Sequence, residues 1–116
     1  MRHTCCAALI AVTLGVTLTA VSYVNFEQIT VAATAIGFTA TKITPSGQPM
    51  ATQAFCRLRT AEISYRIDGG APTTTVGILW EPGEEKTFNG HDVLANFSAI
   101  RTGATSGQLD CSYTAP

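Results

Sequence analysis

The sequence has little charge of either sign. Lys, Arg, Asp and Glu together make up 13% of its 116 residues, against roughly a quarter in a typical soluble domain. No run of basic residues occurs. Because a surface that binds nucleic-acid phosphates needs clustered Lys and Arg, we expect no nucleic-acid partner. The hydrophobic share of 46% also argues against a disordered, charge-swollen chain.

The motifs that usually carry catalysis, metal binding or cofactor binding are also missing. None of the four cysteines forms the C-x-x-C pair of a zinc or redox site. His91 and Asp92 are neighbours in a turn pattern with no nucleophile-elbow serine, so we expect a solvated loop histidine. Most acidic residues lie in turns, and calcium and phosphate loops are absent. We therefore predict no enzyme, no catalytic residue, no metal site and no cofactor.

Thr, Ser, Gly, Ala and β-branched residues replace the missing charge, and they favour strands over exposed helices. Short alternating runs separated by turn signals fill the chain from residue 23 onward. We predict extended segments over residues 28–32, 38–43, 55–59, 63–67, 78–80, 86–88, 97–101 and 108–113. Asp68-Gly69 and Asn89-Gly90 are strong turn dipeptides. The segment after Asn89-Gly90, residues 91–95, fits either one helical turn or a link.

This spacing predicts an all-β fold, a small antiparallel β-sandwich or small barrel of about seven or eight short strands. We divide the chain into an apolar segment, residues 1–22, and a β-sandwich domain, residues 23–116. The expected core residues are Ile29, Val31, Phe38, Ile43, Leu58, Ile63, Tyr65, Ile67, Leu79, Ile100, Leu109, Cys111 and Tyr113.

Three residues of the predicted domain can have special roles. Cys56 and Cys111 both fall on inward faces of their strands, so a disulfide between them is possible, but the sequence does not define the strand order. Trp80, the sole tryptophan, adjoins a Glu-Pro-Gly turn. It is a candidate interface or ligand-stacking residue, and the more ordinary interpretation is a core or interface anchor.

The apolar segment, residues 1–22, has two interpretations. Arg2 is its only charge, a run of small and apolar residues follows, and Ala20-Val21-Ser22 has the small-x-small pattern of a cleavage site, which is typical of a secretory signal peptide. The run is too short for a stable transmembrane helix, so we expect no stable membrane insertion. Alternatively the segment is retained as a docking arm or as a strand.

Three stretches carry a resemblance to known proteins. Residues 27–40, 63–73 and 99–109 together resemble small β-rich proteins encoded among the virion genes of tailed bacteriophages. A shorter string, Tyr65-x-x-Asp68-Gly69-x-x-Pro72-Thr73, is also similar to fibronectin-like accessory modules of secreted carbohydrate-active enzymes. The phage resemblance implies an architectural role without catalytic residues.

Two functions follow as hypotheses. The first is a non-enzymatic virion structural protein, such as a capsid decoration or head or tail component, located in the virion. Its partners would be other virion proteins and copies of itself. The alternative is a secreted or cell-surface β-sandwich binding module, with carbohydrate as its candidate ligand, if residues 1–22 are a cleaved signal peptide.

Overall fold

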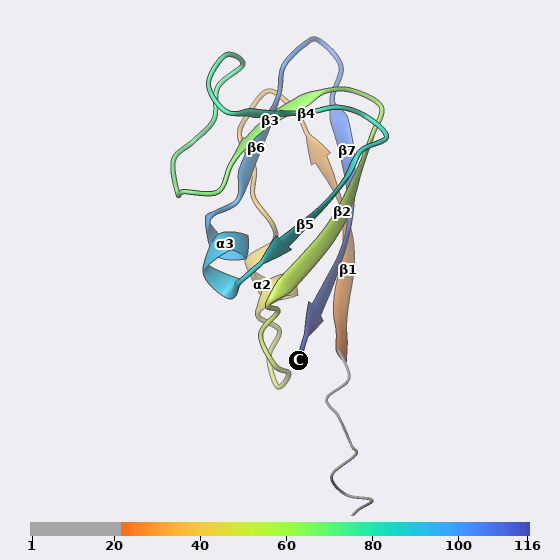
Figure 1. The fold of residues 1–116 in the computed structure, drawn as a ribbon, viewed down its shortest axis with the longest axis vertical. Helices are drawn as coiled ribbons and strands as arrows, with labels where there is room; N and C mark the ends of the chain where they lie inside the picture. The colour runs from red at the N-terminus through yellow and green to blue at the C-terminus, as the bar shows by residue number, and fades with distance from the viewer. Residues whose placement is uncertain (1–21) are drawn as a thin grey trace, which may run out of the picture.

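The computed structural model describes residues 22–116 (Figure 1). The predictions for the apolar segment therefore lie outside the described residues, apart from Ser22, which begins the first strand. Seven antiparallel strands form two sheets, and the predicted β-sandwich arrangement is confirmed. The sheets stay separate, so the alternative of a small barrel is wrong.

The larger sheet, here called sheet A, has four strands in the order β1-β7-β2-β5. Their bounds are β1 Ser22–Val31, β7 Gly107–Ala115, β2 Gln53–Arg59 and β5 Glu85–Asn89. The smaller sheet, sheet B, has three strands in the order β4-β3-β6. Their bounds are β4 Ile78–Trp80, β3 Ile63–Arg66 and β6 Ser98–Arg101.

The strand β7 lies at the centre of sheet A, hydrogen-bonded to β1 on one side and to β2 on the other. Burial alternates along its whole length, as the period of two in a pleated strand requires. Leu109, Cys111 and Tyr113 face inward and are fully buried, as the alternation of the sequence predicts. This strand therefore provides the middle of the core.

Aromatic side chains fill the space between the two sheets. Phe38 stacks on Phe97 with ring centroids 4.1 Å apart, and Phe38 also meets Tyr113 edge-on at 5.4 Å. Tyr65 meets Trp80 edge-on at 5.6 Å. Stacked and edge-to-face pairs of this kind add to the free energy gained by burying the rings.

The predicted strand over residues 38–43 is wrong, because a short helix, α2 (Ala40–Ile43), occupies most of it. Its physical cause is a tertiary contact. The backbone N–H and the hydroxyl of Thr39 both donate hydrogen bonds to the carboxylate of Glu27 on β1, at 3.0 Å and 2.6 Å. The chain is held there and turns into the helix. Phe38 and Ile43 are nonetheless buried, as expected.

The prediction of a core position is wrong for Ile67 and Leu79, because both side chains are exposed. A third predicted core residue, Ile100, is only half-buried. The strand β3 ends at Arg66, so Ile67 belongs to the loop that follows. On β4 the inward position belongs to Trp80, and its neighbour Leu79 therefore faces away from the core. A shift of one residue in a strand exchanges its two faces.

A second helix, α3 (His91–Asn96), follows β5 and confirms the helical alternative for this segment. Its N-cap is Gly90, whose φ of 103° lies in the region that glycine tolerates best. Leu94 anchors the helix in the core. Neither helix of residues 22–116 is long and apolar enough to cross a membrane.

The outward position of Leu79 can be tested by comparing it with the buried Leu109. We expect Leu109→Ala to lower the free energy of unfolding by about 3 kcal/mol, because it opens a cavity in the core. The exposed Leu79→Ala should change it by less than about 0.5 kcal/mol. Urea denaturation measures both. Equal losses for the two variants would contradict the assignment of Leu79 to the surface.

Candidate functional site

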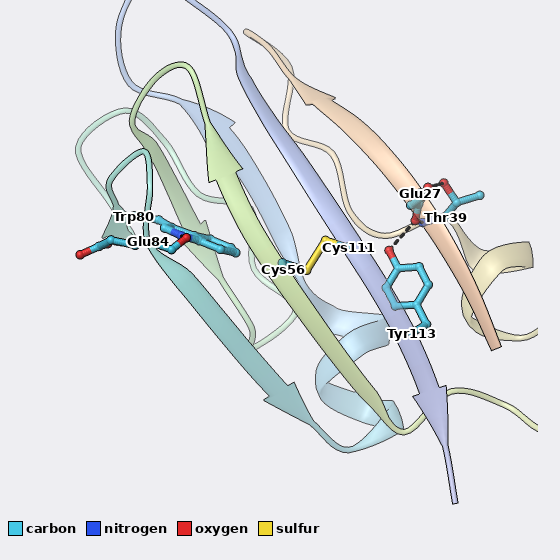
Figure 2. The surroundings of a disulfide bond; sticks show 7 residues. All are labelled: Glu27, Thr39, Cys56, Trp80, Glu84, Cys111 and Tyr113. Atoms are coloured by element: carbon cyan, nitrogen blue, oxygen red, sulfur yellow. Dashed lines mark hydrogen bonds between the residues drawn. A yellow bond between two sulfur atoms is a disulfide. The ribbon is translucent and has the colours of Figure 1, made fainter. Parts of the chain in front are cut away.

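A disulfide joins Cys56 on β2 to Cys111 on β7 (Figure 2). The two residues are direct cross-strand partners, their Cα atoms are 4.1 Å apart, and both side chains are fully buried. The sequence places both cysteines on inward faces but does not show that β2 and β7 are neighbours. The structure supplies that adjacency and so brings the predicted pair together.

Trp80 lies in the core, with no exposed area, so the prediction of an exposed interface or ligand-stacking residue is wrong. Its indole Nε1–H donates a hydrogen bond to the backbone carbonyl of Glu84 at 3.0 Å (Figure 2). The ammonium of Lys86 lies 5.8 Å from the centre of its ring. The turn after β4 thus satisfies the polar end of the indole, and Trp80 acts as the core anchor that the sequence left open.

Glu27 links three segments of the chain from its position on β1. Besides the two hydrogen bonds from Thr39, its carboxylate accepts one from the phenol of Tyr113 on β7 (Figure 2). Burial, followed by this hydrogen bond and the charge of Glu27, raises the pKa of Tyr113 far above its usual value. The contact holds β1 and the loop before α2 on the core.

Two carboxyl groups meet where β3 begins and β4 ends. Ile63 is paired with Trp80, so the adjacent Glu62 and Glu81 come together. Their mutual hydrogen bond lowers the pKa of Glu62, which also accepts a hydrogen bond from Thr102 at 2.7 Å, and raises the pKa of Glu81. The sequence does not reveal this pair, because the two residues are brought together only by the pairing of β3 with β4. Glu81 is exposed and Glu62 is half-buried.

His91 is the first residue of α3 and is half-buried, so the prediction of a solvated loop histidine is wrong. Its Nδ1 lies 3.0 Å from the backbone carbonyl oxygen of Ala51, and this contact fixes the ring to the segment that precedes β2. Within residues 22–116, no group of three or more His, Cys, Asp and Glu residues is arranged to hold a metal ion.

The outer face of sheet A carries a row of four side chains that runs across all four strands. Phe26 on β1 is opposite Ser112 on β7, which is opposite Phe55 on β2, which is opposite Thr87 on β5. Phe26 and Phe55 are each 46% exposed. Two half-exposed aromatic rings therefore share one row, with a small hydroxyl side chain between them. We call this the Phe26–Phe55 row.

Polar side chains flank the Phe26–Phe55 row on both sides. Toward one end of the strands, Arg57 pairs with Glu85 at 3.3 Å and Arg59 pairs with Asp110 at 2.8 Å. Toward the other end, the Gln53 amide donates to Asn89 at 2.9 Å. The four charges of this face therefore pair with each other, and the rest of its polar groups are amides and hydroxyls.

A second apolar surface lies on the loop after β3 and on the edge strand β4. Its members are the exposed residues Ile67, Val76 and Ile78, here called the β4 patch. These three residues, together with Arg66 and Asp68, line a cavity of about 340 Å³. Leu79 is also exposed, but it follows Ile78 on β4 and so points to the opposite face of the strand. Arg66 and Asp68 form a bidentate ion pair at 2.7 and 3.0 Å. The hydrogen bond from the Arg66 guanidinium is the main cause that lowers the pKa of Asp68 to about 2.

Comparison with known proteins gives no relative: no protein-family model, no curated protein and no solved structure matches this chain.

The raised pKa of Tyr113 predicts a loss of stability at alkaline pH. An unfolded tyrosine ionises near pH 10, whereas the folded phenol keeps its proton, so its contribution is present below about pH 10 and is lost as pH rises further. Urea denaturation of the wild type between about pH 9 and pH 11 should show this fall.

The control variant is Tyr113→Phe, which has no phenol to ionise. Its free energy of unfolding should fall less steeply with pH than that of the wild type. Some slope should remain, because burial also raises the pKa of Tyr65. Identical slopes for the two proteins would contradict a retained proton on Tyr113.

Proposed function

We propose that this protein is an exported, non-enzymatic β-sandwich binding module held together by a disulfide. The observation that carries the proposal is the Cys56–Cys111 bond at the centre of the core. Stable disulfides form in oxidising compartments, such as the periplasm or the extracellular space, and are rare in the cytosol. A buried cross-strand pair of this kind therefore supports a location outside the cytoplasm.

The bond would contribute much of the stability of so small a domain. The linked residues are 55 positions apart, and closing a loop of that length is worth roughly 4 kcal/mol in the chain-entropy model. Small domains have a net stability of about 5 to 15 kcal/mol in total. A fold that depends on this bond suits a compartment in which the bond persists.

The sequence of residues 1–22 supports export independently, because it matches the pattern of a signal peptide. Cleavage after Ser22 would remove only the first residue of β1 and would leave its pairing with β7 from Tyr23 onward. It would also remove Cys5 and Cys6, so that Cys56 and Cys111 would be the only thiols left to pair.

Two exposed surfaces support binding as the activity. The Phe26–Phe55 row and the β4 patch both present apolar side chains to solvent, and groups of exposed apolar residues are typical of interaction sites. The Glu62–Glu81 pair belongs to neither surface.

A virion structural protein of a tailed bacteriophage, such as a capsid decoration or head or tail component, is the second candidate. The observation that favours it is the edge strand β4, which exposes Ile78 and Leu79 and whose free side another subunit could cover. Its partners would be copies of itself and other virion proteins. The resemblance of residues 27–40, 63–73 and 99–109 to such proteins supports the same candidate.

Mass spectrometry of the protein from its native source separates the two candidates. The proposal predicts that the protein is recovered from the cell exterior, begins near Tyr23, and yields a peptide in which Cys56 is linked to Cys111. Digestion without reductant, after alkylation of free thiols, gives the linkage and the N-terminus in one experiment.

Recovery inside purified virions with Met1 intact would overturn the export proposal and favour the virion candidate. Alkylation of both Cys56 and Cys111 in freshly collected material would also overturn it. The matched sample is the same digest after reduction, in which the linked peptide must separate into its two halves.

A further inference from the structure

We propose that the Phe26–Phe55 row is a stacking platform for a single chain of a neutral β-1,4-linked polysaccharide. This inference rests on the proposed function, a binding module, and names the ligand class of one of its surfaces. The Phe26 and Phe55 rings would each pack against the apolar C–H face of a sugar ring.

The spacing of the two aromatic residues is set by the sheet. Phe26 and Phe55 lie on β1 and β2, with β7 between them, and neighbouring strands are about 4.8 Å apart, which separates the two residues by about 10 Å across the sheet. This separation is comparable to the length of two linked pyranose rings, the repeat of a β-1,4-linked chain. One sugar would stack on each ring, and the sugar between them would pass over Ser112.

The charge of the face selects a neutral ligand. The side chains of Arg57 and Arg59 are paired with Glu85 and Asp110 on the same face, so the face offers neither excess cations to a polyanion nor excess anions to a polycation. Nucleic acids and acidic polysaccharides need such excess cations. The amides and hydroxyls beside the row suit the hydroxyl groups of a neutral sugar chain.

The shape of the row suits one narrow polymer chain. The four strands of sheet A span about 14 Å between the backbones of the two edge strands. A single extended chain that crosses the strands would lie over Phe26, Ser112 and Phe55 in turn, because these residues are direct cross-strand partners.

The test uses the purified, oxidised protein, with microcrystalline cellulose as the probe. Depletion binding should show retention of the wild type on cellulose and none on alginate, which is an acidic polysaccharide. Phe26→Leu and Phe55→Leu keep an apolar outward side chain but remove the flat ring. Each should weaken binding about tenfold or more, as expected for an anchor residue of an interface.

Two controls separate ring loss from misfolding. Phe55→Tyr keeps the aromatic ring and should bind within about threefold of the wild type, a change that corresponds to less than 1 kcal/mol. Ile78→Ala removes an exposed apolar side chain from the β4 patch and should leave binding unchanged. Urea denaturation of every variant confirms that it is folded under the binding conditions.

Failure of the wild type to bind cellulose would overturn the inference, as would retention on alginate alone or equal binding by the Leu variants and the wild type. Loss of binding in Ile78→Ala with retention in both Phe26→Leu and Phe55→Leu would place the site on the β4 patch and overturn the inference as well. An exported, disulfide-bonded protein that fails these tests would still satisfy the proposed function. Conversely, an intact Met1 in virions would overturn export without altering the cellulose result.

Discussion

The register between β2 and β7 is the constraint on which the rest of the structure depends. Cys56 and Cys111 are direct partners in that register and are covalently joined. Because side chains alternate along a strand, this one pairing fixes which residues of both strands face the core. Leu58 is thereby placed opposite Leu109, both inward and fully buried.

The same register also builds the outer face of sheet A. With Cys56 opposite Cys111, the neighbouring Phe55 must lie opposite Ser112 on the solvent side. The strand β1 pairs with the other edge of β7 and brings Phe26 to the same row. A slip of one residue would bury these rings and expose the cysteines, so the core and the proposed binding face are two results of one alignment.

Much of the fold can be predicted from the sequence, because strands with one buried face leave a period of two. The inward faces of β2 and β7 are visible in the alternation of Cys56-x-Leu58 and Leu109-x-Cys111-x-Tyr113. The region near Trp80 is harder, since three consecutive apolar residues give no alternation to assign a face. The helix α2 is invisible locally, because it depends on the contact between Thr39 and Glu27, which are distant in sequence.

The candidate site is less predictable than the core, because it is made by adjacency between strands that are far apart in sequence. Phe26 and Phe55 belong to separate segments, and only the order β1-β7-β2 places them in one row. The Glu62–Glu81 pair arises in the same way, from the pairing of Ile63 with Trp80. Composition did indicate the neutral character of the surface, since the chain has few charges and many hydroxyl side chains.

Nuclear magnetic resonance of the isotope-labelled protein tests the β2–β7 register most directly. With Cα atoms 4.1 Å apart, Cys56 and Cys111 are nearer to the ~4.5 Å of a non-hydrogen-bonded pair than to the ~5.5 Å of a hydrogen-bonded one, so their Hα atoms should be close. The account predicts a strong Hα–Hα nuclear Overhauser effect between these two residues and Cβ chemical shifts typical of oxidised cysteine. Cβ shifts of reduced cysteine, or an Hα–Hα contact that pairs Cys56 with a different residue of β7, would contradict it.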